Sequence, residues 1–237
     1  MSDRWSYYGK GLPYLPQEDW PGWLVVMEGA DGAGRSTQNG LLKEWIEQQG
    51  LPVLDTGLKR STLVSKEITK AKAGNLLGRT TLSLLYTTDL ADQLENQMIP
   101  ALRAGYVVLA DRYIFTMMAR DLARGASRSW LEQLFGFALK PDLVIYLRTS
   151  PEERLHRALD KHETLDFWES GMDLGLAADR YTSFLKYQAL LQDHYERMAS
   201  QYGFATLDGS DSPHQIHHHV RELATRTLKG GGLVAAT

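Results

Sequence analysis

A glycine-rich segment near the N-terminus has the spacing of a loop that binds phosphate. Residues 29–36 read GADGAGRS and fit the pattern G-x-x-x-x-G-K-[ST], except that Arg35 stands where lysine is usual. Glycines let successive backbone N–H groups turn toward one anion, and a helix that follows the loop points its positive N-terminus at the same anion. The hydroxyl of Ser36 is suited to Mg²⁺. We therefore expect a nucleotide-phosphate site here; a strand-to-helix turn without a ligand is the alternative.

Arg35 keeps the positive charge of the usual lysine but delivers it differently. A planar guanidinium on a longer stem is not interchangeable with a compact ammonium beside the β- and γ-phosphates. We expect nucleotide binding to survive this exchange better than turnover does. The alternative is that Arg35 turns to solvent or pairs with a carboxylate.

The elements around this loop alternate between strand and helix. Short apolar runs, typical of strands buried on both faces, lie at 24–27, 52–54, 106–110 and 143–147, with an edge strand expected at 204–207. Helical spacing or capping signals predict helices at about 35–50, 80–103, 129–139, 151–159, 181–202 and 213–228. This alternation predicts an α/β fold with a parallel sheet, helices on both faces, and ligands beyond the carboxyl ends of the strands.

Composition limits the classes of function. The 237 residues include no cysteine, which excludes a disulfide framework, a thiolate zinc site and a cysteine nucleophile. The net charge of -3 offers no overall positive field for a nucleic-acid polymer. No apolar stretch approaches the roughly 18 residues of a membrane-spanning helix, and the first residues lack the apolar core of a signal peptide. We expect a cytoplasmic protein that binds neither nucleic acid nor membrane.

The length predicts one main domain with short additions at both ends. Residues 1–21 contain three prolines and several aromatic residues without a regular period, so we expect an extended arm that packs on the domain surface. The domain is expected to span residues 22–229. Residues 230–237 begin with three glycines and are expected to form a flexible tail.

Three segments, in order, resemble the thymidylate kinase family. Residues 28–38, EGADGAGRSTQ, are similar to its phosphate loop E-G-x-D-G-A-G-K-S-T-Q. Residues 111–125, which begin Asp-Arg-Tyr and end Arg-Gly, resemble its D-R-Y-x-x-S-x-x-A-Y-Q-x-x-x-R-G stretch. Residues 141–152 resemble its P-D-L-x-x-Y-L-x-x-x-P-E strand and helix start. The similarity covers about residues 23 to 207, and the loop together with D-R-Y is much more specific than either alone.

The resemblance implies the P-loop kinase fold of nucleoside monophosphate kinases. In that fold three layers, α/β/α, enclose a mainly five-stranded parallel sheet, and a mobile lid is expected at about residues 157–173. The implied reaction moves the γ-phosphoryl group of ATP, with Mg²⁺, to dTMP or a related pyrimidine nucleoside monophosphate. The resemblance also suggests a homodimer.

The resemblance implies roles for individual residues in four groups. The ATP-binding residues would be Gly29, Ala30, Asp31, Gly32, Ala33, Gly34, Arg35, Ser36 and Thr37. The catalytic residues would be Arg35, Asp111, Arg112 and Arg157. The acceptor would be bound by Asp31, Arg112, Tyr113, Thr116 and Arg120. Mg²⁺ would be held by Ser36 and, through water, by Asp111.

Structural roles that need no ligand are the alternatives for several of these residues. Asp111 can instead cap the next helix, and Arg112 can form an exposed ion pair. Arg157 can belong to a solvated helix face rather than to the lid. A guanidinium fork nevertheless matches phosphate oxygens well, which favours Arg112 as a phosphate contact.

The chain departs from the family pattern at positions expected to contact substrate. Leu90 stands where the stretch L-F-A-A-D-R-A has an arginine that helps to bind the monophosphate, and Phe167 stands where a D-R-x-E pattern has one. Arg120 and Asp121 replace a Tyr-Gln pair associated with the thymine side of the pocket. These departures leave two alternatives open: a nucleotide-binding protein of the same fold with weak or lost kinase activity, and a deoxynucleoside kinase.

Overall fold

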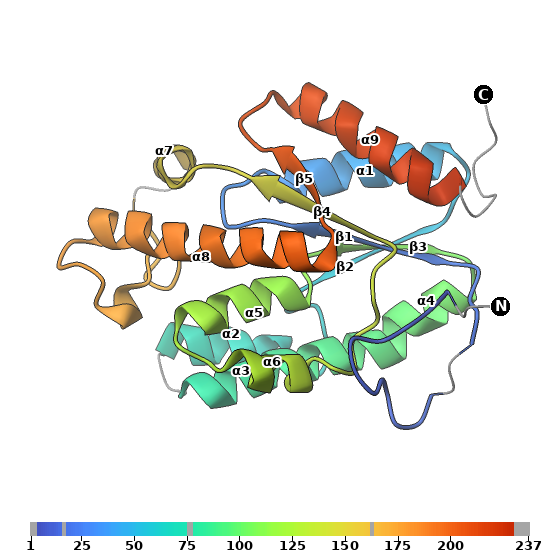
Figure 1. The fold of residues 1–237 in the computed structure, drawn as a ribbon, viewed down its shortest axis with the longest axis horizontal. Helices are drawn as coiled ribbons and strands as arrows, with labels where there is room; N and C mark the ends of the chain where they lie inside the picture. Colours follow the sequence, from blue (N-terminus) through green and yellow to red (C-terminus); the bar gives the residue numbers. More distant parts are fainter. Residues whose placement is uncertain (1–3, 16–17, 75–77, 162–163, 230–237) are drawn as a thin grey trace.

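A sheet of five parallel strands in the order β2-β3-β1-β4-β5 forms the centre of the molecule (Figure 1). The computed structural model describes residues 4–15, 18–74, 78–161 and 164–229. The strands are β1 (Trp23–Glu28), β2 (Val53–Gly57), β3 (Val107–Asp111), β4 (Leu143–Arg148) and β5 (Ala205–Asp208). Val25 of β1 is in register with Leu109 of β3 on one side and Leu143 of β4 on the other. The predicted five-stranded parallel sheet is confirmed.

Helices cover both faces of this sheet (Figure 1). One face carries α1 (Arg35–Gln48) and α9 (Pro213–Lys229), which pack against each other. Most of the other helices lie on the opposite face, and α7 lies near the carboxyl end of β4. The helices other than α1 and α9 are, in chain order, α2 (Ser65–Gly74), α3 (Arg79–Gln93), α4 (Ile99–Arg103), α5 (Ile114–Ala123), α6 (Arg128–Leu134), α7 (Pro151–Lys161) and α8 (Arg180–Tyr202). The three-layer α/β/α arrangement therefore agrees with the prediction.

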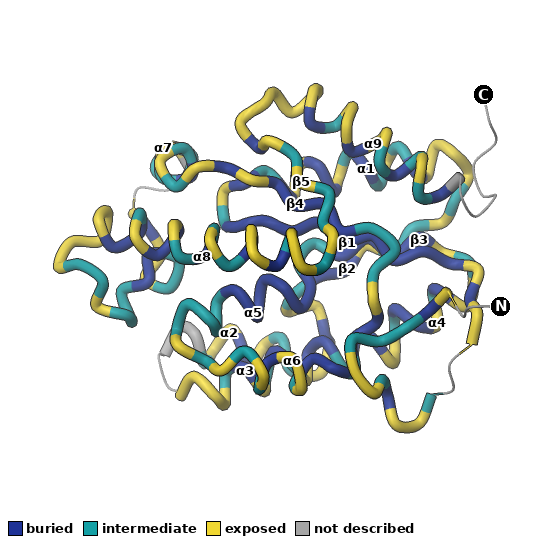
Figure 2. The backbone as a smooth tube through the Cα atoms, viewed as in Figure 1, coloured by how far each residue is buried: buried dark blue, intermediate teal, exposed yellow. Residues whose placement is uncertain are grey.

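The central strands are buried on both faces, as their apolar runs predict. All six residues of β1 are buried, and β1 and β3 are almost wholly dark in Figure 2. Val25 and Met27 join the apolar cluster under α1 and α9, whereas Leu24 and Val26 join the cluster under α5 and α8. This packing fixes the carboxyl ends of the strands, from which the candidate site residues extend.

Several predicted helix boundaries are corrected by the structure. The helix expected at 80–103 is a helical run in which a π-helical segment, Leu94–Met98, separates α3 from α4. The helix expected at 129–139 ends at Leu134. It stops because residues 136–140 accept and donate backbone hydrogen bonds with residues 6–11, so the chain there cannot continue as a helix. Helix α2 and a short 3-10 helix, Met172–Leu174, were not predicted.

Residues 4–15 and 18–21 pack against the end of the sheet where β1 begins. The indole of Trp5 is 1% exposed, lies 5.4 Å from the ring of Trp20, and donates a hydrogen bond to the Trp20 carbonyl. The guanidinium of Arg4 stacks 3.5 Å from the ring centre of Trp23 and pairs with Asp142 at 3.0 Å. These contacts lie at the end of the molecule opposite α7 (Figure 1).

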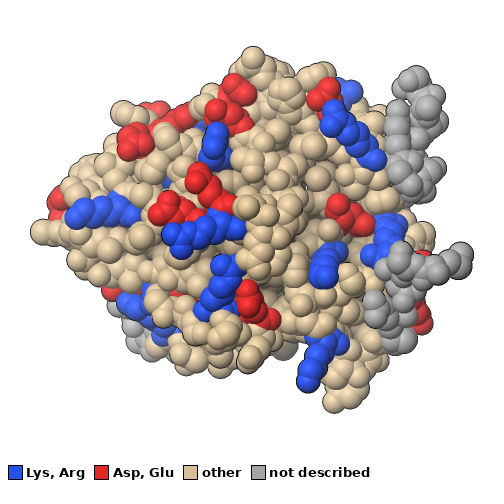
Figure 3. All heavy atoms as spheres, in the orientation of Figure 1, with Lys and Arg blue, Asp and Glu red and all other residues tan. Residues whose placement is uncertain are grey.

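Charges of both signs are interspersed on the face of the molecule drawn in Figure 3. Lysine and arginine side chains lie beside aspartate and glutamate side chains across this face. Within the described residues, no helix combines the length and the apolar character needed to cross a membrane.

The burial of Trp5 leads to a stability prediction. Trp5→Ala is expected to lower the free energy of unfolding by about 3–5 kcal/mol, because it removes a large buried ring and leaves a cavity. Tyr14→Ala, in the same arm, replaces a side chain that is 89% exposed and is expected to change it by less than about 0.5 kcal/mol. Urea unfolding followed by circular dichroism measures both, and equal stabilities of the two variants would contradict the packing role of Trp5.

Candidate active site

The glycine-rich loop connects the buried strand β1 to helix α1. Gly29, Gly32 and Gly34 have φ values of 149°, 81° and 92°, which side chains with a Cβ rarely adopt. A Cβ on Gly29 would also lie 2.9 Å from the Leu147 carbonyl oxygen. The loop thus needs glycine both for its turn and for its close approach to β4. A glycine-rich turn between a strand and a helix N-terminus is the arrangement of a phosphate-binding loop.

The side chains of this segment divide into buried and exposed groups. Ala30 and Ala33 are 2% and 1% exposed and anchor the loop in the core. Ser36 and Thr37, in the first turn of α1, are exposed, and no side chain caps this helix start. The backbone N–H groups of the first turn and two hydroxyl groups are therefore available to a ligand.

Arg35 turns inward and pairs with Asp111. Its Nε donates to Asp111 Oδ1 at 2.9 Å, and its Nη1 donates to the carbonyl oxygens of Gly29 and Ala30. The side chain is only 9% exposed, so of the two alternatives for Arg35, the carboxylate pair is the one adopted. Asp111 thereby orients the guanidinium beneath the loop. Its second oxygen has no hydrogen-bond partner among the described residues.

Asp31 lies between two arginine side chains that the sequence assigns to the acceptor. Arg112 and Arg120 each pair with one of its carboxylate oxygens, the second at 2.9 Å. Burial alone would raise the pKa of Asp31, but the charges of Arg112 and Arg120 outweigh it and hold this pKa well below its ordinary value. The ion pair that Arg112 forms is therefore not an exposed one, since its side chain is 11% exposed. Three of the five residues predicted to bind the acceptor therefore lie together.

The backbone of Arg112 is held in an unusual conformation by a buried carboxylate. Arg112 has φ 74°, a left-handed value that is costly for a residue other than glycine. Next to it, Glu28 is fully buried and accepts hydrogen bonds from Tyr113 N at 2.8 Å, Thr116 N at 3.2 Å and Thr116 Oγ1 at 2.6 Å. Tyr195 OH lies 3.3 Å from the same carboxylate. Burial raises the pKa of Glu28, and the hydrogen bond from Thr116 opposes this rise.

Tyr113 and Thr116, which the resemblance assigns to the acceptor, are buried and bonded to other groups of the protein. The Tyr113 ring is 1% exposed, and its hydroxyl donates to the Leu139 carbonyl at 3.1 Å. Thr116 is fully buried and bonded to Glu28. Both residues hold the turn that carries Arg112. Sequence reasoning gave Glu28 no role, although a charged residue at the end of an apolar strand was a usable signal.

Arg157 reaches from α7 to the phosphate loop. It donates to the carbonyl oxygens of Gly32 at 3.1 Å and Gly209 at 2.8 Å, and it pairs with Glu153 on its own helix. It therefore joins the loop to the segment after β5 rather than belonging only to a solvated face. Of the segment predicted as a lid, residues 157–161 belong to α7, and residues 162–163 lie outside the described residues.

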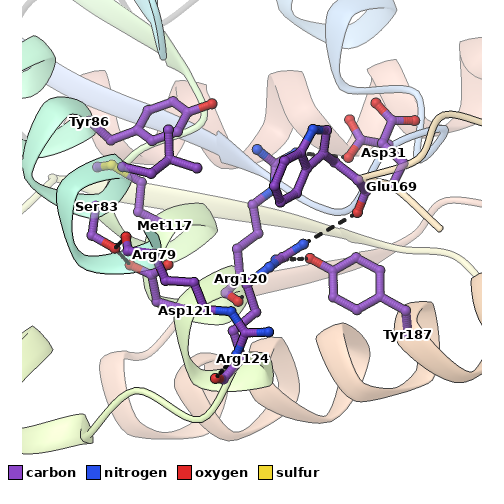
Figure 4. Close-up of a pocket in the computed structure, with 12 residues that line it drawn as sticks. Asp31, Arg79, Ser83, Tyr86, Met117, Arg120, Asp121, Arg124, Glu169 and Tyr187 are labelled. Carbon is purple, nitrogen blue, oxygen red and sulfur yellow. Dashed lines mark hydrogen bonds and ion pairs between the residues drawn. The ribbon is translucent and has the colours of Figure 1, made fainter. Parts of the chain in front are cut away.

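A pocket opens beside Asp31, between α3, α5, α8 and the segment before α8 (Figure 4). Its lining residues are Asp31, Arg79, Leu82, Ser83, Tyr86, Met117, Arg120, Asp121, Arg124, Trp168, Glu169 and Tyr187. Three of them, at 117, 120 and 121, lie on α5, and a fourth, at 124, follows it directly. Their helical spacing was a signal available in the sequence. Leu90, by contrast, is 4% exposed and packs in the core without lining this pocket.

Arg124, directly after α5, links one side of the pocket to Asp173 and to Tyr187 of α8. Its guanidinium makes two hydrogen bonds to the Asp173 carboxylate, at 2.9 and 3.0 Å, and donates to Tyr187 OH at 2.5 Å. Glu169 faces Asp31 in this pocket, and burial followed by the charge of Asp31 raises the pKa of Glu169. Trp168 and Glu169 thus line the same pocket as Asp31 and Arg120, and Phe167, beside them, is 38% exposed.

The residues predicted to hold Mg²⁺ do not form a metal site by themselves. No group of three or more His, Asp or Glu side chains that could hold a metal ion occurs in the described ranges. The exposed Ser36 hydroxyl and the unpartnered oxygen of Asp111 are nevertheless hard oxygen donors. Mg²⁺ commonly takes one or two protein ligands and completes its shell with waters and substrate phosphates. These two residues fit that requirement.

Comparison with known proteins agrees with this geometry. The family model described as thymidylate kinase matches residues 27–220. The chain belongs to the thymidylate kinase family. A probable thymidylate kinase 2 of Saccharolobus solfataricus is 34% identical over 203 residues, which cover 85% of this chain and 95% of that protein. A probable thymidylate kinase of Pyrococcus abyssi is 30% identical over 216 residues, 88% and 98% of the two chains.

A bacterial relative extends this similarity. The thymidylate kinase of Chlorobium chlorochromatii is 30% identical over 224 residues, which cover 86% of this chain and 95% of that protein. The residues that the family model matches include the loop, the Arg112 turn and α8. The resemblance stated from three short segments is confirmed at the level of the family.

The contacts of Glu28 lead to a prediction for Thr116. Thr116→Val keeps the shape of the side chain but removes the hydroxyl that donates to the buried carboxylate, so the free energy of unfolding is expected to fall by about 1–3 kcal/mol. Thr88→Val, at an exposed site on α3, is the matched control and is expected to change it by less than about 0.5 kcal/mol. Urea unfolding tests this, and an unchanged midpoint for Thr116→Val would refute it.

Proposed function

We propose that the protein moves the γ-phosphoryl group of ATP to dTMP or a closely related pyrimidine nucleoside monophosphate. Membership of the thymidylate kinase family supports this reaction. The observation that carries it is the pairing of Asp31, in the phosphate loop, with Arg112 and Arg120, beside a pocket that Asp31 and Arg120 line. Phosphoryl transfer requires chiefly that donor and acceptor be positioned and that cations surround the transferred group, and this arrangement supplies both.

The ATP phosphates would be bound by the loop amides and the first turn of α1. The hydroxyls of Ser36 and Thr37 are exposed at this helix start, where its dipole favours an anion. Arg157, already bonded to the Gly32 carbonyl, would close the loop over the phosphates. Arg35 would supply positive charge from below while Asp111 keeps its plane fixed.

The acceptor phosphate would compete with Asp31 for Arg112 and Arg120. A phosphate monoester carries more negative charge than a carboxylate and offers three oxygens, so it forms stronger paired hydrogen bonds with guanidinium groups. On acceptor binding, Asp31 would be released from at least one arginine and could accept a hydrogen bond from the sugar. Mg²⁺, held by Ser36 and Asp111 together with phosphate oxygens and water, would neutralise charge on the β- and γ-phosphates.

Two paired arginines favour a phosphate-bearing acceptor over a nucleoside that lacks a phosphate. We therefore retain the monophosphate kinase as the proposal rather than a deoxynucleoside kinase or a nucleotide-binding protein without transfer.

The homodimer and the cytoplasmic location also stay predictions. Gel filtration with light scattering tests the first, and fractionation of cells tests the second.

ADP release, measured with ATP, Mg²⁺ and single nucleoside monophosphates, tests the proposed reaction. Turnover that depends on dTMP, dUMP or another pyrimidine monophosphate is expected. Thymidine in place of dTMP distinguishes the nucleoside kinase alternative. The proposal would be refuted if none of the monophosphates increased the release of ADP.

Arg112→Ala is expected to affect the acceptor far more than the donor. The loss of a charged hydrogen-bonding partner of the phosphate should raise the KM for dTMP by about 10- to 100-fold while the KM for ATP changes by less than about threefold. Arg226→Ala, at an exposed position on α9, is the matched control and should leave both constants unchanged. Steady-state kinetics with each substrate varied in turn measures this. Equal increases in the two KM values would contradict the role of Arg112.

A further inference from the structure

The pocket has two chemically different ends, which fixes the direction of an acceptor in it. Asp31 and Arg120 form the end next to the phosphate loop, where the acceptor phosphate must lie if it is to receive a phosphoryl group. The base must then lie toward the other end, between α3 and α5. Figure 4 shows Ser83 and Asp121 together there, on the side away from Asp31 and Glu169.

The walls between the two ends suit a flat aromatic ring. Leu82, Tyr86 and Met117 line this part of the pocket, and Tyr86 and Met117 are 8% and 4% exposed. Apolar and aromatic surfaces of this kind favour a ring held by stacking and dispersion, with a few polar groups that set its orientation. Ser83 and Asp121 supply polar groups at the α3–α5 end of the pocket, which Arg79 and Arg124 also line.

Asp121 offers one open hydrogen-bond acceptor at this edge. Its Oδ2 lies 2.7 Å from Ser83 Oγ, whereas its Oδ1 has no hydrogen-bond partner among the described residues. Ser83 is buried and holds the carboxylate in place from the facing helix. Arg124, one turn along α5, directs its guanidinium to Asp173 and Tyr187 and does not pair with Asp121. Asp121 is partly buried, and this oxygen can accept a hydrogen bond from a donor on the ligand.

We propose that Asp121 Oδ1 accepts the N3–H of a uracil-type base, thymine or uracil, and that Ser83 positions the carboxylate for this contact. The inference rests on the proposed function, because it assumes that the pocket holds a nucleoside monophosphate. A cytosine ring in the same place presents an unprotonated N3, whose lone pair faces the carboxylate. The resulting repulsion and lost hydrogen bond select against cytosine.

Two acceptor analogues and one substitution test the contact. For the wild-type protein, kcat/KM for dTMP is expected to exceed the value for dCMP, and for N3-methyl-dTMP, by at least about tenfold. Asp121→Asn replaces the acceptor-only carboxylate by an amide that can also donate to the N3 of cytosine. The ratio of kcat/KM for dTMP to that for dCMP is expected to fall by at least about tenfold in this variant.

Asp193→Asn is the matched control, since it makes the same change at an exposed site on α8 and should leave the ratio unchanged. An Asp121→Asn ratio within about twofold of the wild-type value, or equal kcat/KM for dTMP and N3-methyl-dTMP, overturns the inference. Thermal unfolding of each variant identifies a loss of folding.

Equilibrium binding separates this inference from the proposed reaction. Isothermal calorimetry of dTMP, dCMP and N3-methyl-dTMP with the wild-type protein and with Asp121→Asn gives the same comparison without turnover. Selective binding of dTMP that is lost in Asp121→Asn supports the contact even if no phosphoryl group is transferred. Turnover of dTMP without discrimination at N3 leaves the proposed reaction standing and removes the role of Asp121. Failure of all three nucleotides to bind overturns both.

Discussion

The carboxylate of Asp31, shared between Arg112 and Arg120, is the interaction on which the acceptor end of the site depends. Two buried guanidinium groups repel each other and lose hydration, so they need an anion between them. Burial and the neighbouring charge of Arg35 accordingly lower the pKa of Arg112. Asp31 supplies the counter-charge in the absence of substrate, and Glu28 fixes the turn that carries Arg112. The two guanidinium groups are thus held together by contacts within the protein.

Much of the fold was predictable because parallel strands buried on both faces are short apolar runs that the sequence displays directly. The residues of β1, β3 and β4 are of this kind. The end of α6 was not predictable in the same way. It depends on the approach of Gly9 to Gly136, residues far apart in the chain, whose pairing no local pattern encodes.

The candidate site was predictable where its residues are neighbours in sequence. The loop at 29–36 and the pair Asp111 and Arg112 lie at the ends of recognisable strands. Tyr195 and Tyr187 come from α8, whose spacing indicated only a buried face, so their approach to Glu28 and Arg124 required the folded chain. The bond from Thr116 to Glu28 also required the folded chain, because a motif gives the identity of a residue but not the direction of its side chain.

The packing of Trp5 and Trp20 has a consequence for where the folding unit begins. The family model starts at residue 27, yet Trp5 is as deeply buried as the central strands, and the backbone of residues 6–11 bonds to the segment before β4. An expression boundary drawn at the start of the family match would remove these two indoles together with Trp23–Val26 of the buried strand β1, and leave their apolar neighbours open to water. Such a fragment would be prone to self-association, whatever the state of its distant catalytic end.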